Sequence, residues 1–567
     1  MKHKEKQCWN DFFPDLLERF FLAAGAVCVG IALFALLCCR EYPERLAGNR
    51  ILMLFVLLFF VSGAAVYRIS GKGKKQGGNS ALNRTLNRTL NRTLNRTLNW
   101  RIMLVLGYAA LFVAQVLWVN KVYFYTGWDV VTIRSHIEWV INGGTMQDRS
   151  IDLLFSIYPN NLLFFYLSCL IEKIGILFSM AEPYDLCIYI SCLCVNLSCL
   201  LGNLIMRRLS ESNVVRFLYT VISTVFILFS PWIMIPYSDT FGMPFVMLGI
   251  WGVVCLKQRY AKWGVVSFAG FVGYLIKPTC IFPLFAAGIV FGVRYLLCLR
   301  KYWRELFALI LCGVVSWCIG LLIPLWIQHT YSFRIYPDSR MTHTHFLMMG
   351  INEETGGGFS TEDFMYSLGF PDVKTREQAD RELFVRRLGE LAEGRRLGTF
   401  LKRKTLVNFN DGTFAWNGEG GFFFEKVEHE GILWKWFLDT MVPPGTWENE
   451  GVYYYLFRTI MQMIWLQILV GVMFVGFDRR NFPAQKACLM IALCGLMAFV
   501  MIFEARARYL FLYSPVFLIL SLCGYEGIWG RVAAWISHFK YIKMILPVEG
   551  RDCFDYNKKD YTETGMK

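Results

Sequence analysis

Charged residues are scarce in this sequence. They make up 18% of the 567 residues, whereas hydrophobic residues make up 55%. Soluble domains carry about 25% charge, and a soluble protein with this composition would need an unusually large core. A bilayer removes that requirement because lipid covers apolar surface. The composition therefore excludes an ordinary soluble protein and indicates a membrane protein.

Cysteine pairs are missing from the two regions that we expect outside the membrane. Residues 328–455 contain no cysteine, and residues 121–183 contain only Cys169. A disulfide framework requires pairs of cysteines, so we expect none there. Cys192 and Cys194 lie in an apolar run, where we expect packing residues rather than metal ligands.

Long apolar runs recur along the whole chain. Each is about 17–25 residues long, the length that a helix needs to cross a hydrocarbon core of about 30 Å. They predict an all-α polytopic membrane protein with about 12–13 transmembrane helices. The first run is not expected to be a cleaved signal, because no small-residue cleavage site follows it and further spans do. We place spans at 20–39, 51–67, 102–120, 184–206, 213–231, 241–256, 263–277, 280–298, 305–327, 454–476, 486–503 and 509–527.

The net charge of +15 comes from basic residues in the short links between spans. Cytoplasmic links of membrane proteins carry an excess of Lys and Arg. This pattern predicts that both termini are cytoplasmic and that residues 121–183 and 328–455 lie outside. It also accounts for the charge without a nucleic-acid partner. The basic links include the block 68–101, which has no acid, and the residues Arg207, Arg208, Lys257, Arg259, Arg300, Lys301, Arg479 and Arg480.

We divide the chain by this expected topology. Residues 1–101 would hold two spans and a basic link, in which 82–99 repeat Leu-Asn-Arg-Thr. Each repeat fits a glycosylation pattern, but a cytoplasmic link would instead lie along anionic headgroups of the lipid bilayer. Residues 102–327 would form the transmembrane core with the first outer loop 121–183, and 328–455 the large extracytoplasmic loop. The last spans would occupy 456–527 and a cytoplasmic tail 528–567.

Two outer segments are expected to carry helices. The apolar run that follows Asn161 is interrupted by Glu172 and Lys173. A charge at the bilayer centre costs roughly 2.5–3.5 kcal/mol, so we expect 160–179 to lie along the outer face. Residues 328–455 mix acids and bases like a soluble region. A helix is expected from Thr375, which has capping-box spacing to Gln378.

Two acidic residues stand at outer ends of spans. Asp129 follows the span 102–120, and Asp239 precedes the span 241–256. A carboxylate held there could take a proton from an acceptor hydroxyl. Either residue could instead cap a helix. Two acids from separate loops on one face favour a shared site.

Basic residues on the outer side are exceptions to the positive-inside pattern, which indicates a specific role for them. Lys277 lies between two closely spaced spans, and Arg506 and Arg508 lie between the last two. The guanidinium fork matches phosphate oxygens, so these residues are candidate phosphate ligands. Lys277 could equally reach a lipid headgroup, and Arg506 or Arg508 could pair with Glu504.

Histidine ligands for a metal are not expected. His343 and His345 are two residues apart and do not share a helix face, and a zinc site would need further ligands nearby. No cofactor is therefore predicted, although a divalent metal stays possible.

The order of these features resembles the GT-C superfamily of membrane glycosyltransferases, which use sugars carried on polyprenyl phosphate. Their first outer loop begins with an acid soon after a span and holds membrane-parallel helices. Trp128-Asp129 is similar to that start, and Ser238-Asp239-Thr240 is similar to their second acidic motif. Tyr158, Pro159, Asn160 and Asn161 resemble the stretch that ends the first part of the loop. The resemblance implies a GT-C-like bundle with Asp129 as catalytic base.

A closer resemblance is to membrane proteins of Gram-positive bacteria described as dolichyl-phosphate-mannose-mannosyltransferase-like. It covers roughly residues 100–527 and implies substrate-binding roles for His345 and Asn352. One acid stands where O-mannosyltransferases have an Asp-Glu pair, and the Asp-x-Asp and Trp-Trp-Asp motifs of oligosaccharyltransferase are missing. The resemblance rests on 344–352, 356–359, 411–414 and 506–511.

These observations predict a membrane glycosyltransferase of the bacterial cell membrane. The expected donor is a polyprenyl-phosphate-linked sugar, and the acceptor a cell-envelope glycan, lipid or protein. A membrane transporter or flippase of a lipid-linked precursor is the alternative, but it would place its polar residues near mid-membrane. A scaffold protein would leave Asp129, Lys277 and Arg506 without a common site.

Overall fold

The computed structural model describes residues 2–41, 45–76, 100–146, 154–420, 423–425, 427–477 and 483–545. The Leu-Asn-Arg-Thr repeat at 82–99 and the pair Arg479-Arg480 lie outside the described residues.

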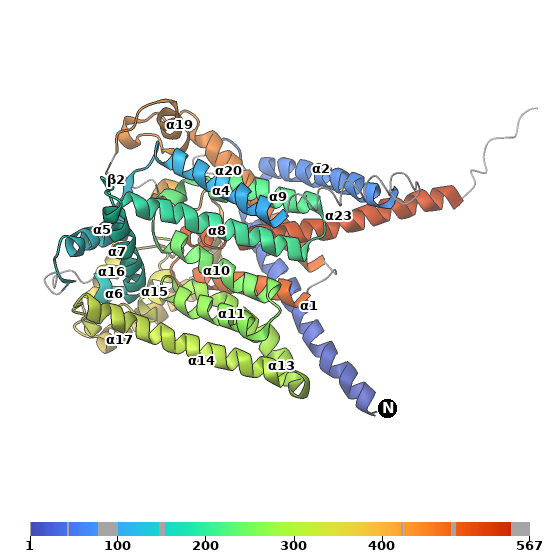
Figure 1. Ribbon diagram of the computed structural model, residues 1–567, viewed down its shortest axis with the longest axis horizontal. Coiled ribbons are helices and arrows are strands. Elements are labelled where there is room, and N and C mark those ends of the chain that lie inside the picture. The colour runs from blue at the N-terminus through green and yellow to red at the C-terminus, as the bar shows by residue number, and fades with distance from the viewer. Residues whose placement is uncertain are drawn as a thin grey trace, which may run out of the picture.

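A bundle of long helices forms the body of the molecule (Figure 1). Two of its passages contain a π-helical turn, η3 and η6. The passages are α1 (Lys2–Leu37), α2 (Asn49–Gln76), α4 (Trp100–Val119), α8 (Asp185–Leu209), α9 (Asn213–Ser223) with η3 (Thr224–Leu228), α10 (Ser238–Cys255), α11 (Arg259–Tyr274), α12 (Phe282–Ala287) with η6 (Gly288–Gly292) and α13 (Val293–Leu297), α14 (Leu299–Thr330), α20 (Tyr454–Met473), α21 (Pro483–Ile502) and α23 (Ser514–Ile545).

The helices confirm a polytopic all-α membrane protein. By length and composition, 11 helices of the described chain could cross a membrane. Ten of them coincide with predicted spans, and the eleventh is Pro159–Leu177. The other two predicted spans, 213–231 and 263–277, correspond to the shorter passages α9–η3 and α11. The helix ends at η3, so the Leu228 carbonyl there has no partner within the helix. The buried side-chain amide of Gln115 donates to this carbonyl at 2.7 Å.

The basic links gather at one end of the bundle. The Arg207 guanidinium lies 4.4 Å from the Trp100 ring centre, and Arg294 pairs with Asp15 at 2.8 Å. The start of α1 and the end of α23 lie at this same end, on the right of Figure 1. α23 runs on to Ile545, so the expected tail begins as a continuation of the last helix.

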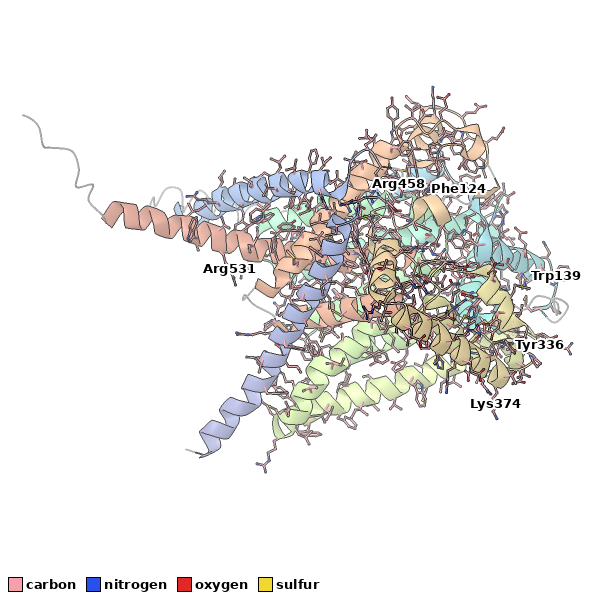
Figure 2. The ribbon with its side chains drawn as sticks, turned by 180° about the vertical axis from the view of Figure 1, so that it is seen from behind. Phe124, Trp139, Tyr336, Lys374, Arg458 and Arg531 are labelled. Atoms are coloured by element: carbon pink, nitrogen blue, oxygen red, sulfur yellow. The ribbon has the colours of Figure 1, made fainter. Side chains whose placement is uncertain are left out.

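The first loop and the large loop lie at the opposite end of the bundle from the basic links. Trp139, Tyr336 and Lys374 lie there in Figure 2, far from Arg531 at the other side of the molecule. The first loop forms β1 (Tyr125–Thr126), α5 (Trp128–Ile141), α6 (Leu154–Ile157), η2 (Pro159–Asn161) and α7 (Leu162–Leu177).

The helix α7 lies across the direction of the spanning helices (Figure 1). Near its start, the Phe164 ring contacts Tyr237, just before α10, at a 5.7 Å centroid distance. Near its end, Gly175 packs against Pro183, just before α8. Both neighbours belong to the same end of the bundle, so α7 lies at this end although it has the length and composition of a span. Its position relative to the membrane surface stays a prediction.

The large loop folds into short helices over this end. They are η7 (Pro337–Ser339), α15 (His343–Gly350), α16 (Thr361–Leu368), α17 (Val373–Glu393), α18 (Leu397–Phe409), η8 (Trp416–Gly420), α19 (Ile432–Met441) and η9 (Thr446–Glu448). Strand β2 (Phe423–Glu425) pairs antiparallel with β1. The expected helix start at Thr375 is wrong. The helix α17 begins at Val373 because the side chain of Asp372, its N-cap, accepts from the Thr375 amide at 2.9 Å.

Buried hydrogen bonds fix the loop to the bundle. The Trp232 indole donates to the Thr413 carbonyl at 2.9 Å, and the Trp465 indole donates to the Phe409 carbonyl at 2.8 Å. At Gly412 the two backbones approach so closely that a Cβ would lie 2.4 Å from the Met461 carbonyl oxygen. The loop is therefore part of the packed structure and can place side chains at the ends of the spanning helices.

Candidate functional site

The carboxylate of Asp129 lies in the first turn of α5, at the outer end of the bundle. Gly127 is the N-cap of this helix, so Asp129 is not its cap. The Tyr237 hydroxyl donates to Asp129 Oδ2 at 3.0 Å. Burial, reinforced by the Asp129 charge, raises the pKa of Tyr237 well above its ordinary value, so this phenol remains a donor. Asp129 is half-buried and keeps a face toward solvent.

The backbone at Trp128 gives Asp129 its place. Trp128 has a φ of 46°, a left-handed conformation that costs about 1–3 kcal/mol for a residue with a side chain. Its indole donates to the Glu419 carbonyl at 3.1 Å, and its ring contacts Tyr237 edge-on. The Arg508 guanidinium lies 4.4 Å from the same ring centre. These three contacts hold the strained turn.

Asp239 sits between two cations. It lies in the first turn of α10, whose N-cap is Tyr237. Its Oδ1 pairs with the Lys277 ammonium, and its Oδ2 lies 3.3 Å from Arg508 Nε. All three side chains are at most 8% exposed. Lys277 is therefore buried beside Asp239 rather than extended toward a lipid headgroup.

Glu419, from η8 of the large loop, joins the two arginines. Its Oε2 lies 3.6 Å from an Arg506 nitrogen and 3.3 Å from an Arg508 nitrogen. Arg506 also pairs with Glu504 at 2.9 Å, which is the ion pair that the sequence left open. Sequence reasoning missed Glu419, because nothing in its spacing separates it from the other acids of the loop.

We call Asp129, Asp239, Lys277, Glu419, Glu504, Arg506 and Arg508 the ion cluster. It joins three cations and four acids from five separate segments at one end of the bundle. Arg506 and Glu419 are more open than Lys277 and Arg508, with side chains 24% and 22% exposed against 8% and 4%. The ion cluster is therefore more accessible on the side of Arg506 and Glu419 than on the side of Lys277.

The motif at 158–161 lies at the edge of the ion cluster. Burial raises the pKa of Tyr158 above its ordinary value, and the charges of Asp129, Glu504 and Arg506 also act on it. Asn161 is buried, and its side-chain oxygen has no hydrogen-bond partner in the described part of the chain. Asn160 is half-buried beside it on η2.

The large loop also anchors the segment that carries the arginines. The Ala505 amide donates to the Gly357 carbonyl at 2.7 Å. Lys404, which is buried, donates to the carbonyls of Gly350 and Phe503. Burial lowers the pKa of Lys404 to about 8. Gly357 has a φ of 82°, a conformation that favours glycine. This anchoring gives Gly357 a structural role.

The structure places His345 and Asn352 in a different network. The Asn352 amide donates to Asp363, which also pairs with Arg387 at 2.7 Å. His345 lies 2.8 Å from the Ser367 hydroxyl. The partners of both side chains belong to helix α16 and not to the ion cluster, so we leave the two residues out of the candidate site.

The tautomer of His345 follows from its neighbours. Ser367 donates its proton to Asp380 at 2.7 Å, so its oxygen accepts from Nδ1–H of His345. Nε2 is then a buried acceptor without a hydrogen-bond partner among the described residues. Burial lowers the pKa of His345 to about 4, because the protonated ring would need a partner at Nε2 that the loop does not supply.

The stability of the protein should therefore decrease in mild acid. The unfolded histidine takes up a proton near pH 6.5, whereas folded His345 does so only near pH 4. The free energy of unfolding should therefore be highest above pH 6.5 and should decrease by on the order of 3 kcal/mol as the pH falls to 4. Thermal unfolding of the protein and a His345→Asn variant between pH 7.5 and 4 measures this loss. An equal pH dependence in both proteins would contradict it, since the buried Asp380 titrates in both.

A metal site is a separate question. Among the residues that the structure describes, no group of three or more His, Cys, Asp or Glu side chains is placed to hold a metal ion. The acids of the ion cluster are instead interleaved with its three cations.

Comparison with known proteins gives one family and one solved structure. A search of the curated proteins finds no match. The structure of the archaeal oligosaccharyltransferase AglB from Archaeoglobus fulgidus, in complex with an inhibitory peptide and a dolichol-phosphate, matches with 12% identity and a TM-score of 0.34. The match covers 80% of this chain and 52% of that one, so this chain spans about half the length of AglB. Residues 80–527 match the family described as "Conserved hypothetical integral membrane protein", and the chain belongs to that family.

Proposed function

We propose that the protein is a GT-C-like glycosyltransferase of the bacterial cell membrane. It transfers a sugar from a polyprenyl-phosphate carrier to a cell-envelope glycan, lipid or protein on the outer face. The observation that carries the proposal is the ion cluster, in which a half-buried carboxylate lies beside three cations at one end of the bundle.

The reaction needs a base and a site for the leaving phosphate. In the proposed step the acceptor hydroxyl gives its proton to Asp129, and its oxygen forms a bond to the anomeric carbon of the sugar. The bond from that carbon to the phosphate oxygen breaks, and polyprenyl phosphate leaves with one more negative charge. A single displacement of this kind inverts the anomeric configuration.

Each group of the site suits one part of this step. The Tyr237 hydroxyl orients the Asp129 carboxylate, and general-base catalysis contributes roughly 10²- to 10⁴-fold. Arg506, Arg508 and Lys277 stabilise the charge that develops on the phosphate. Because the cations are already held by carboxylates in the described structure, they need little rearrangement when the phosphate binds.

The placement of the polar groups favours transfer over transport. A transporter binds its cargo near the bilayer midplane between broken helices. The ion cluster instead occupies helix ends and loops. In this proposal Tyr158, Asn160 and Asn161, at its edge, contact the sugar or the acceptor.

The experiment for the proposal is a donor panel. Purified protein is incubated with polyprenyl-phosphate sugars and a cell-envelope fraction, and both free polyprenyl phosphate and labelled acceptor are measured. At least one donor should yield the two products together. Release of neither product from any donor would contradict the proposal.

The proposal also requires that the ion cluster faces outward. In a variant without other reactive cysteines, Gly420→Cys should react with a membrane-impermeant thiol reagent in intact cells. Gln76→Cys should react only after the membrane is opened, because it lies in the basic block that we expect in the cytoplasm. Labelling of Gln76→Cys in intact cells would place the ion cluster on the wrong face.

A further inference from the structure

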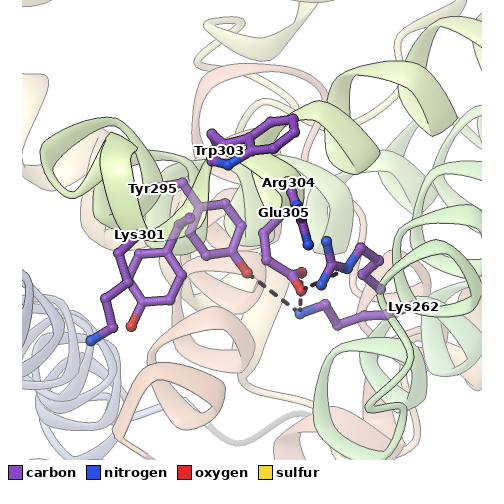
Figure 3. A pocket seen from close by; sticks show the side chains of 8 residues that line it. Lys262, Tyr295, Lys301, Trp303, Arg304 and Glu305 are labelled. Carbon is purple, nitrogen blue, oxygen red and sulfur yellow. Dashed lines mark hydrogen bonds and ion pairs between the residues drawn. The ribbon is translucent and has the colours of Figure 1, made fainter.

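A cavity of about 520 Å³ (Figure 3) lies beside α13, at the end of the bundle where the basic links gather in Figure 1. It is formed by the start of α11, the end of α13 and the start of α14. Four of its lining residues are basic, Arg259, Lys262, Lys301 and Arg304, and one is acidic, Glu305. Its size is typical of sites for small ligands, roughly 300–1,000 Å³.

The single acid is already bound within the wall. Glu305 lies 3.6 Å from Arg259 Nε and 3.5 Å from Lys262 Nζ, and it accepts from the Trp263 indole at 3.1 Å. Lys262 also lies 3.4 Å from the Tyr295 hydroxyl (Figure 3). Four cations and one acid leave the lining with a net charge of three positives, so the cavity suits an anion.

The helix α14 connects the cavity to the lipid-facing surface. Trp303 lines the cavity and is 53% exposed. Phe307, Ile310 and Val314 follow it at helical spacing on the same face, and they are 53%, 57% and 51% exposed. Exposed apolar residues on a spanning helix face lipid, and Trp prefers the headgroup level. The cavity therefore opens at the level where lipid phosphates lie.

We propose that this cavity binds the phosphate-bearing headgroup of an anionic phospholipid, with an acyl chain along the Trp303 face of α14. The charge of the lining selects an anion, and the apolar stripe selects a lipid over a free phosphate. Basic pockets between membrane helices bind anionic headgroups in this way. The inference does not depend on the proposed transfer reaction.

Native mass spectrometry of delipidated protein tests the proposal with phosphatidylglycerol, phosphatidylcholine and inorganic phosphate as probes. Phosphatidylglycerol should bind in preference to phosphatidylcholine. The double variant Lys301→Gln, Arg304→Gln should bind it roughly tenfold more weakly or worse. The matched control Lys257→Gln removes an exposed cation that does not line the cavity, and it should bind normally.

Three results would overturn the proposal. The first is equal loss of binding in Lys257→Gln, which would indicate general surface charge. The second is equal binding of phosphatidylcholine. The third is binding of inorganic phosphate alone with the same dependence on Lys301 and Arg304. Charge reversal in Lys301→Glu should weaken binding more than Lys301→Gln, and a thermal unfolding curve shows that each variant is folded.

Discussion

Asp129→Asn should reduce sugar transfer by about two to four orders of magnitude and leave binding of the lipid donor unchanged. The substitution keeps the size of the side chain and an oxygen that can accept from the Tyr237 hydroxyl, but it removes the basicity of the carboxylate. This range is the contribution of a general base. The donor stays bound because its phosphate would be held by Lys277, Arg506 and Arg508.

The matched control is Glu138→Gln on the same helix. Glu138 pairs with Arg134 one turn away and is 48% exposed, far less enclosed than the ion cluster. Its loss should change transfer by less than a factor of about two, since exposed helix pairs contribute little. A folded Asp129→Asn protein with near-normal transfer would reduce this residue to a structural role. Asp239 would be a poor replacement, because two buried cations already hold it.

Arg508→Ala should do the reverse and weaken donor binding by roughly 10- to 100-fold, the loss of one charged hydrogen-bond partner. The change also removes a buried cation that pairs with Asp239 and contacts the Trp128 ring, so thermal unfolding of the variant is measured beside binding. Equilibrium binding of a fluorescent polyprenyl phosphate measures the effect. The donor affinity of Arg508→Lys should lie between those of the original protein and Arg508→Ala, since lysine restores the positive charge but not the forked guanidinium group.

Arg381→Ala, an exposed arginine on α17, is the control for this measurement and should bind the donor normally. The two site variants should differ in kind, because Asp129→Asn fails in chemistry and Arg508→Ala fails in binding. Loss of binding in both would indicate a disturbed fold, and normal binding in Arg508→Ala would remove this residue from the phosphate site.

The helices and most of the ion cluster could be predicted from the sequence. Span lengths follow from bilayer thickness, and basic links mark one end of the bundle. Asp129, Asp239, Lys277 and the two arginines stand out because each interrupts the chain at the end of an apolar run. A helix cap, a lipid contact or a local ion pair could explain each residue alone, and a shared site is favoured because the topology brings all of them to one face.

The remaining features depend on tertiary contacts. Glu419 enters the ion cluster from a loop that folds back over the helix ends, and its local sequence gives no sign of this. His345 and Asn352 lie in a segment that resembles the mannosyltransferase-like family. Their side chains contact Ser367 and Asp363 of the next helix, and these contacts could not be seen in the local sequence. The passages α9–η3 and α11 are short. A π-helical turn ends the first and polar residues flank the second, and hydropathy alone does not locate either boundary.

The most direct test of sugar transfer uses the protein in sealed liposomes that contain a polyprenyl-phosphate sugar with a labelled sugar group. The acceptor fraction is supplied on the side of the ion cluster. Transfer predicts that label appears on the acceptor while polyprenyl phosphate accumulates in equal amount, and that Asp129→Asn reduces both by about two to four orders of magnitude. Movement of the intact lipid-linked sugar across the bilayer, without cleavage and without dependence on Asp129, would contradict the account and identify a flippase.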